Sequence, residues 1–427
     1  MLIKNGNVII FENEDVKVKK LDIRIDGEEI TETKEKLEEK ANEKVIDASD
    51  KVVMPGLINT HAHIAMSIFR VTFEGSDLYT WLNEKIWPIE ANLTPDDIYN
   101  ASMVSILEMI STGTTCVNDH YFFSNKIREA FEKSKMRAVI TRVLMDSDGK
   151  EASNIRIKEF IELYESRNKN NNLITYTVSP HGLYTCSSEI LQISKELAIK
   201  YNLPIHTHFL ESISEIESIK KLHGDSASNV IKKYFDGLKI ILAHGVKIND
   251  EDIRILKNLD CSISHNPISN LRLGCKIADI TKYLNEGLNV SLGTDGQGSG
   301  NNLDMFETMK IAGLIQGGIH ENEKRIGSKD VIKMATINGA KALGLEKEIG
   351  SIEKGKKADI IIVNMEEKLD NIKMMPNLNV ISNLVYNTEG RCVDTTIING
   401  EILMEDRKIK NINVEEAIKN CKRIIKC

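Results

Sequence analysis

The stretch "INTHAHIAMS", residues 58–67, places two histidines one residue apart, directly after an apolar run. In a β-strand, residues i and i+2 face the same side, so His61 and His63 point the same way if the run is a strand. Neutral imidazoles bind zinc or iron well, and a further nitrogen plus a carboxylate would complete a catalytic metal site. The pair therefore raises two questions: which fold surrounds it, and where the other ligands lie.

The middle of the chain alternates apolar runs with longer, charged segments whose apolar residues recur at three- and four-residue steps. This alternation is typical of repeated strand–helix units. Eight units over roughly 290 residues predict an α/β fold with a (β/α)₈ TIM-type barrel, slightly longer than the ~250 residues typical of that fold. The apolar runs are residues 52–58, 114–119, 137–144, 173–181, 203–209, 238–245, 261–267 and 288–296.

The two chain ends differ from this middle. Both contain short strand-like runs separated by turn residues, and the last segment, "VEEAIKNCKRIIKC", has helical spacing. We therefore expect residues 1–54 and 346–427 to form one small β-sandwich domain with a terminal helix. Residues 55–345 are expected to form the catalytic barrel.

Polar residues stand near the C-terminal end of every predicted barrel strand, the face at which barrel enzymes place their chemistry. His208 and Asp295 are the natural further ligands, because a closed barrel brings strands 1, 5 and 8 around one centre. An isolated H-x-H pair is more often two loop histidines, but the polar residues at the other strand ends favour a metal site. These strand-end residues are His61, His63, Asp119, His120, Arg142, His181, His208, His244, His265 and Asp295.

Several motifs identify a family. "PGLINTHAH", "HTHFLE", "LAHG", "SHNPISN" and "LGTDG" occur in this order, followed by "ATINGAKALGL" and "GSIEKGKKADIIIV". Over nearly the whole chain the sequence resembles the amidohydrolase superfamily, and more narrowly the 5-methylthioadenosine/S-adenosylhomocysteine deaminases. Binuclear members of this architecture carry a modified lysine on strand 4, which here ends "TVSPHG" without one. One divalent metal is therefore expected, most readily zinc, with iron as the alternative.

The resemblance implies a set of site residues. The metal ligands would be His61, His63, His208 and Asp295, and the catalytic residues Glu211, His244 and Asp295. Substrate contacts would come from Trp81, Glu90, Arg142, His181, Glu211 and Asp295.

These residues suit hydrolytic deamination. Asp295 can ligate the metal and accept a proton from water, and His244 can steady the attacking oxygen. Glu211 can protonate a ring nitrogen and later help ammonia to leave. Trp81 suits an apolar 5′-substituent, and the two oxygens of Glu90 suit a ribose diol.

The preferred 5′-substituent stays open at this point. Arg142 lies within a predicted strand and would suit a carboxylate ligand, or a protein partner such as Asp119 or Asp146. Relatives can carry a second arginine for an amino-acid tail, but the matching position here is Asn154, with Arg156 two residues later. Candidate substrates are 5′-methylthioadenosine, S-adenosylhomocysteine, adenosine and 5′-deoxyadenosine.

Two other functions were weighed. A guanine deaminase or triazine-type hydrolase would use the same metal site on a free base, and an inactive barrel could act as a scaffold. The intact set of ligands and catalytic residues argues against the scaffold. The chain of 427 residues has a net charge of −7 and no apolar stretch long enough to span a bilayer, so we expect neither nucleic acid nor membrane as partner. The resemblance implies a small nucleoside substrate. A cytoplasmic homo-oligomer is expected.

Overall fold

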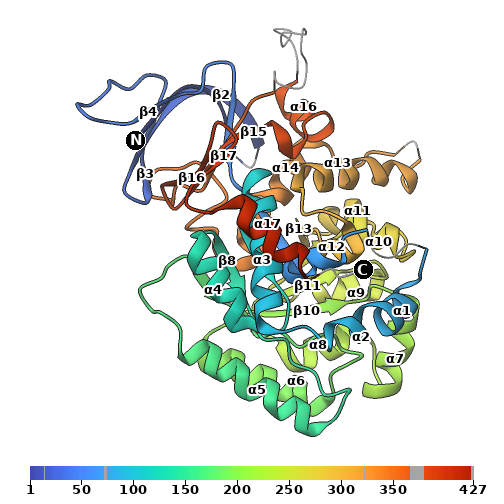
Figure 1. Ribbon diagram of the computed structural model, residues 1–427. Coiled ribbons are helices and arrows are strands. Elements are labelled where there is room, and N and C mark those ends of the chain that lie inside the picture. The colour runs from blue at the N-terminus through green and yellow to red at the C-terminus, as the bar shows by residue number, and fades with distance from the viewer. Residues whose placement is uncertain (14, 72–74, 322, 366–378, 425–427) are drawn as a thin grey trace.

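Eight parallel strands form a closed barrel in the computed structural model, which describes residues 1–13, 15–71, 75–321, 323–365 and 379–424 (Figure 1). The first four strands are β6 (Leu57–Ala62), β7 (Thr114–Asp119), β8 (Arg137–Ile140) and β9 (Ile174–Tyr176). The second four are β10 (Ile205–Phe209), β11 (Ile240–His244), β12 (Cys261–His265) and β13 (Asn289–Leu292).

Two seams join these four-stranded sheets into one barrel. At the first, Val178 pairs with Ile205 in a parallel bridge. At the second, the Asp295 amide donates to the carbonyl of His61 at 3.0 Å, and the Thr60 hydroxyl donates to the carbonyl of Leu292 at 2.9 Å. The (β/α)₈ barrel predicted from the sequence is confirmed.

Helices surround the barrel, and their N-termini follow ordinary capping rules. Thr94 and Asp97 form a capping box at the start of α3, and Ser212 caps α7. None of the described helices is long and apolar enough to cross a bilayer. The larger ones are α3 (Pro95–Ser111), α4 (Ser124–Ser134), α5 (Lys150–Glu165), α6 (Ser188–Tyr201), α7 (Ile213–His223), α8 (Ala227–Phe235), α9 (Asp250–Leu256), α13 (Met305–Ile315), α14 (Ser328–Ala335) and α15 (Ile337–Leu343).

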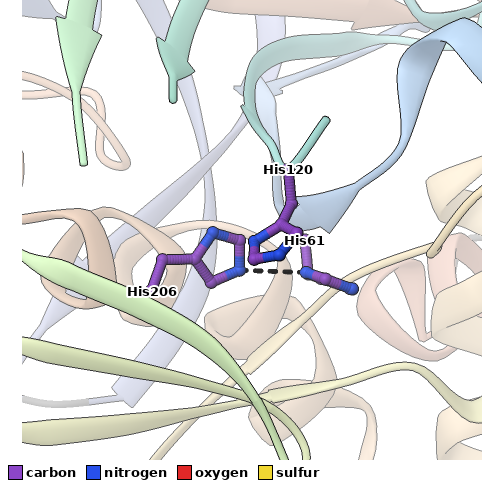
Figure 2. Close-up of side chains that lie close together, drawn as sticks. All are labelled: His61, His120 and His206. Carbon is purple, nitrogen blue, oxygen red and sulfur yellow. Dashed lines mark hydrogen bonds between the residues drawn. The ribbon is translucent and has the colours of Figure 1, made fainter. Parts of the chain in front are cut away.

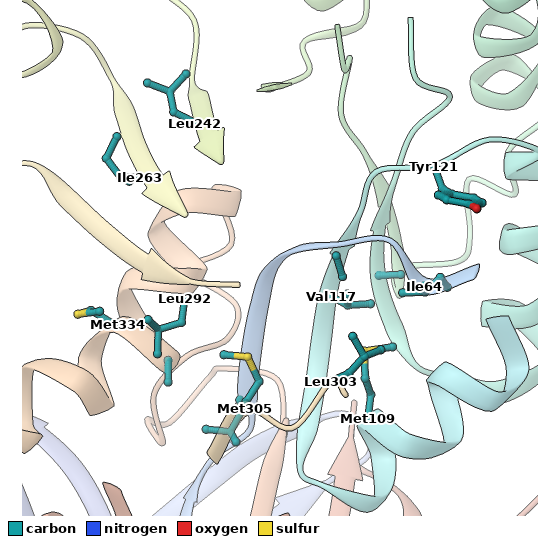
Figure 3. Packing of buried hydrophobic residues seen from close by; sticks show 14 of the residues in the cluster. Ile64, Met109, Val117, Tyr121, Leu242, Ile263, Leu292, Leu303, Met305 and Met334 are labelled. Atoms are coloured by element: carbon teal, nitrogen blue, oxygen red, sulfur yellow. The ribbon is translucent and has the colours of Figure 1, made fainter. Parts of the chain in front are cut away.

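The hydrophobic core lies between the strands and these helices. Strand residues such as Val117 and Leu292 share one buried cluster with the helical residues Met109, Met305 and Met334 (Figure 3). Each fully buried side chain of this size contributes on the order of 1.5–3 kcal/mol relative to exposure. This packing makes the barrel a rigid frame for the residues at its strand ends.

Both chain ends contribute to a second, nine-stranded sheet, which confirms the predicted small β domain. The strands form one continuous sheet rather than two facing ones, so the expected sandwich is a single sheet that curls back on itself (Figure 1). Glu29 closes the curl by pairing with Lys357. The strands are β1 (Leu2–Glu12), β2 (Asp15–Asp26), β3 (Glu29–Lys34), β4 (Val45–Asp47), β5 (Val52–Pro55), β14 (Ile360–Val363), β15 (Val393–Ile398), β16 (Glu401–Glu405) and β17 (Lys408–Ile409).

The apolar run at 52–58 contributes to both domains. Strand β5 belongs to the nine-stranded sheet, and β6 starts the barrel after Gly56. A Cβ at Gly56 would meet the Thr115 hydroxyl at 2.1 Å, so the two domains meet where only glycine fits. The domain limits at 54/55 and 345/346 remain predictions. The terminal segment is helical as expected, α17 (Val414–Lys422), and it packs on α3 of the barrel (Figure 1).

A buried ion pair fastens the small domain to the start of β8. The Arg137 guanidinium donates to both carboxylate oxygens of Asp359, at 2.7 and 3.1 Å, and both side chains are buried. Asp359→Ala is expected to lower the free energy of unfolding by about 3–5 kcal/mol, because it leaves a buried guanidinium without its partner. Urea unfolding would measure this loss.

The exposed pair between Lys135 and Glu401 provides the control. Lys135→Ala should cost less than about 1 kcal/mol, since water screens that pair. Equal losses in Asp359→Ala and Lys135→Ala would contradict the structural role of the buried pair.

Candidate metal and catalytic site

Four ligand atoms converge at the C-terminal face of the barrel. Oδ1 of Asp295 lies 3.3 Å from Nε2 of His61 and 3.0 Å from Nε2 of His63. Nε2 of His208 lies 3.4 Å from Nε2 of His63. Strands β6 and β10 and the turn after β13 supply these residues, so the structure brings together all four ligands expected from the sequence.

Neighbouring groups orient these ligands. Nδ1 of His63 donates to the carbonyl of His120 at 2.5 Å, which leaves the lone pair of Nε2 toward the site. Oδ2 of Asp295 accepts hydrogen bonds from the hydroxyls of Ser269 and Ser299, at 2.6 and 2.7 Å, so Oδ1 is the oxygen that faces the histidines.

The chemistry of this group fits a divalent cation. Nε2 of His61 and Oδ1 of Asp295 are buried and form no hydrogen bond within the described residues, although they lie close together. Burial lowers the pKa of His61 to about 3 and holds the pKa of His208 well below its usual value, so both imidazoles are neutral. Against the effect of burial, Asp295 raises the pKa of His63 to about 9, so in this structure a proton on His63 balances the carboxylate charge that a cation would otherwise balance. Three imidazole nitrogens and one carboxylate are a ligand set that zinc or iron accepts.

Two other histidine groups share His61. Its ligand atoms lie within 4.8 Å of those of His120 and His206, and also of those of His208 and His244. Nδ1 of His61, however, already forms a 2.9 Å hydrogen bond with Nε2 of His206 (Figure 2). Only the group with Asp295 adds a negative charge to balance a cation. We therefore regard His206 as the residue that orients the His61 ring through this hydrogen bond, and not as a metal ligand.

The backbone is strained where it delivers the catalytic groups. Leu210, His244 and Asp295 have φ of +49°, +76° and +59°, in the left-handed region that costs non-glycine residues energy. Such strain persists only where surrounding contacts hold it. Here it turns the chain so that the side chains of Glu211, His244 and Asp295 reach the same pocket.

Glu211 is held in this pocket by contacts to its backbone. The carboxylate of Glu215 accepts the amides of Leu210 and Glu211, at 2.8 and 2.7 Å. Oε1 of Glu211 lies 3.5 Å from Nδ1 of His244. Burial raises the pKa of Glu211 to about 7, so this carboxyl group can both give and take a proton near neutral pH.

The pocket has a polar floor and an apolar wall. The wall comes from three short helices, α1 (Leu78–Thr80), η2 (Trp81–Ile86) and α2 (Trp87–Glu90). A Cβ at Gly298 would meet the Trp81 ring at 3.0 Å, so the glycine allows Trp81 to pack this closely. The floor includes His63, His181, His208, Glu211, His244 and Asp295.

Five of the six expected substrate contacts line this pocket: Glu211 and Asp295, described above, and Trp81, Glu90 and His181. Trp81 is buried in its wall, and its indole nitrogen has no hydrogen-bond partner within the described residues. Glu90 accepts a hydrogen bond from the Tyr121 hydroxyl, and Nδ1 of His181 is hydrogen-bonded to the Thr185 hydroxyl at 2.9 Å. These last three are placed to meet a bound molecule.

Arg142 does not line the pocket. Its Nε donates to Glu159 of α5 at 2.6 Å, and its guanidinium carbon lies 5.5 Å from the centre of the Phe122 ring, which does line the pocket. Neither Asp119 nor Asp146 is its partner: they accept the backbone amides of Ile64 and Ser187. Its contact with substrate stays a prediction that this arrangement does not support.

Some functional neighbours were not anticipated from the sequence. Ser269 and Asn270 lie on α10 (Pro267–Arg272), within the motif "SHNPISN", in which only His265 is singled out from the sequence. Oδ1 of Asn270 lies 2.8 Å from Nδ1 of His244. The sequence signal that could have identified them is a serine and an asparagine shortly after a strand that ends in histidine.

Comparisons with known proteins agree with this geometry. Residues 52–403 match the model of the amidohydrolase family. The chain is 39% identical over 426 residues to a 5-methylthioadenosine/S-adenosylhomocysteine deaminase of Thermoanaerobacter pseudethanolicus, covering 99% of this chain and 98% of that one. It is 40% identical to a 5′-deoxyadenosine deaminase of Methanosphaera stadtmanae, covering 95% of each. Among solved structures it is similar to an adenosine deaminase of Xanthomonas campestris with bound zinc, at a TM-score of 0.89, 25% identity, and coverage of 99% and 97%.

Proposed function

Because the chain belongs to the amidohydrolase family, we propose that it is a hydrolytic deaminase that converts the adenine of 5′-substituted adenosines to hypoxanthine and releases ammonia. The observation that carries the proposal is the convergence of His61, His63, His208 and Asp295 beside Glu211 and His244 in one pocket. The relatives of 39–40% identity that are named for deaminating such nucleosides support it.

A divalent ion, one per subunit and zinc in our proposal, would supply the acidity that makes water nucleophilic near neutral pH. Glu211 gives a proton to the adenine ring as its C6 carbon is attacked. The attacking water loses two protons in the reaction: Glu211 carries one to the leaving amino group, which departs as ammonia, and the other restores the protonated Glu211. A carboxyl group with a pKa of about 7 suits both directions of transfer. Oδ1 of Asp295 faces the three histidine ligands, and His244 orients the attacking water.

The outer part of the pocket suits a nucleoside better than a free base. Glu90, hydrogen-bonded by Tyr121, offers a carboxylate to a ribose diol, and Trp81 with Leu78 and Ile86 offers an apolar surface to the 5′-substituent. A guanine deaminase or triazine-type hydrolase would need neither feature. The assembled ligand and catalytic groups give no support to an inactive scaffold.

An apolar 5′-substituent should be preferred to a zwitterionic tail. No lysine or arginine is among the described residues that line the pocket, and Arg156 is bonded to Asp148 and to the carbonyl of Met145. Because a buried charge without a partner is costly, we expect kcat/KM for 5′-deoxyadenosine and 5′-methylthioadenosine to exceed that for S-adenosylhomocysteine at least about 10-fold. An ultraviolet assay of adenine loss would measure the three values.

A variant that frees Arg142 tests the reason for this preference. Glu159→Gln removes the charge that neutralises Arg142. It should therefore lower the ratio of kcat/KM for 5′-methylthioadenosine to kcat/KM for S-adenosylhomocysteine. Glu162→Gln, on the same helix α5, is the matched control and should leave the ratio unchanged. A wild-type enzyme that favours S-adenosylhomocysteine would contradict the prediction. The homo-oligomer, the cytoplasmic location and the absence of nucleic-acid and membrane partners remain predictions.

A further inference from the structure

We propose that Asn270 is a positioning residue that holds His244 as the Nδ1–H tautomer, so that its Nε2 lone pair receives a hydrogen bond from the attacking water. This inference rests on the proposed function. His244 ends β11 and Asn270 lies on α10, and each side chain is about 1% exposed. Water therefore does not exchange freely at either group, and protein contacts decide which ring nitrogen carries the hydrogen.

Two oxygens face Nδ1 of His244. Oδ1 of Asn270 lies at 2.8 Å and Oε1 of Glu211 at 3.5 Å. An N–H at Nδ1 satisfies the first as a hydrogen bond of ordinary length and is attracted to the second. A lone pair at Nδ1 would face the oxygen of Asn270 and be repelled by it, and the ionised form of Glu211 would add to this repulsion.

One amide competes for the same nitrogen. Nδ2 of Asn266 lies 3.3 Å from Nδ1 of His244, which is longer than the contact to Asn270. One ring nitrogen cannot donate to Asn270 and accept from Asn266 at once. The shorter contact to Asn270 favours a hydrogen on Nδ1, and the Nδ1–H tautomer has its acceptor at Nε2.

The short helix α10 holds two catalytic side chains through adjacent residues. The Ser269 hydroxyl donates to Oδ2 of Asp295 at 2.6 Å, and Asn270 contacts His244. Nδ2 of Asn270 has no hydrogen-bond partner within the described residues, so its oxygen is the atom that forms a contact. The placement of α10 thus sets Asp295 and His244 relative to one another, which is how a surrounding residue tunes a metal site.

Two variants of Asn270 separate the effect of its acceptor oxygen from the effect of its side-chain volume. Asn270→Leu keeps the approximate volume and removes the acceptor, whereas Asn270→Asp keeps an acceptor oxygen. In Asn270→Leu we expect kcat to fall about 10- to 100-fold, as for loss of a partner that orients a site residue, with KM changed less than about 3-fold and metal content unchanged. Asn270→Asp should recover most of kcat.

A spectroscopic readout tests the tautomer directly. In metal-loaded protein labelled with ¹⁵N-histidine, the signal assigned with His244→Gln should show hydrogen on Nδ1 in the wild type and in Asn270→Asp, but on Nε2 or mixed in Asn270→Leu. Asn383→Leu is the matched control, because Asn383 is a buried amide on α16 (Val380–Tyr386) that accepts from Asn387 and does not line the pocket. It should leave kcat and the His244 signal unchanged.

The outcomes are distinct. An unchanged tautomer in Asn270→Leu, or an Asn270→Asp variant no better than Asn270→Leu, would overturn the role of Asn270. A wild-type protein that binds metal but leaves every adenosine intact would overturn the proposed function, and with it the catalytic part of this inference.

Discussion

Glu211→Gln is expected to lower kcat about 10³-fold, while the metal content of the purified protein stays at its wild-type value. Glutamine has nearly the same shape, but it cannot carry a proton between the ring nitrogen and the leaving ammonia. Glu211 is not among the four converging ligands, so the cation should be retained. Loss of adenine absorbance, release of ammonia and metal analysis would be measured on the same preparation.

The control for this variant lies on the helix that follows. Glu217→Gln changes an exposed carboxylate of α7 and should leave kcat within experimental error. If Glu211→Gln kept more than a tenth of the wild-type kcat, Glu211 could not be the proton shuttle. If the variant lost its metal, Glu211 would belong to the ligand set.

Removal of the metal is expected to abolish turnover, and addition of one equivalent of zinc or iron to restore it. Nε2 of His61 and Oδ1 of Asp295 are buried in the candidate site without a hydrogen-bond partner within the described residues. The metal-free protein should therefore also have a lower Tm, because a ligand that binds only the folded state stabilises it. Dialysis against a chelator, followed by assay, metal analysis and thermal unfolding, would measure all three effects.

A histidine outside the site provides the control for the ligands. His208→Ala should lower the metal content well below one equivalent, whereas His320→Ala should not, because His320 pairs with Asp279 and Glu323 instead. Full activity in metal-free protein would contradict the proposal. Two tightly bound equivalents in the wild type would contradict the expectation of a single metal.

The sequence itself determined the barrel and the place of the ligands. His61 and His63 share a face because strand residues alternate, and His208 and Asp295 join them because barrel closure brings strands 1, 5 and 8 together. The alternation of apolar runs and helix-period segments was enough to predict this closure. The domain limit expected at 54/55 falls within the first apolar run, but the same local rules could not place the division between the two sheets at Gly56, because both halves of the run are equally apolar.

The partner of Arg142 was decided only by tertiary structure. Several carboxylates lie near it in sequence, and the packing of α5 selects Glu159. Ser269, Asn270 and Ser299 likewise reach Asp295 and His244 only because α10 and the short helix α12 (Gln297–Gly300) are oriented in a particular way at the barrel mouth. Periodicity determines which face of an element is buried, whereas hydrogen bonds depend on positions to within a few tenths of an ångström, which only the packed fold determines.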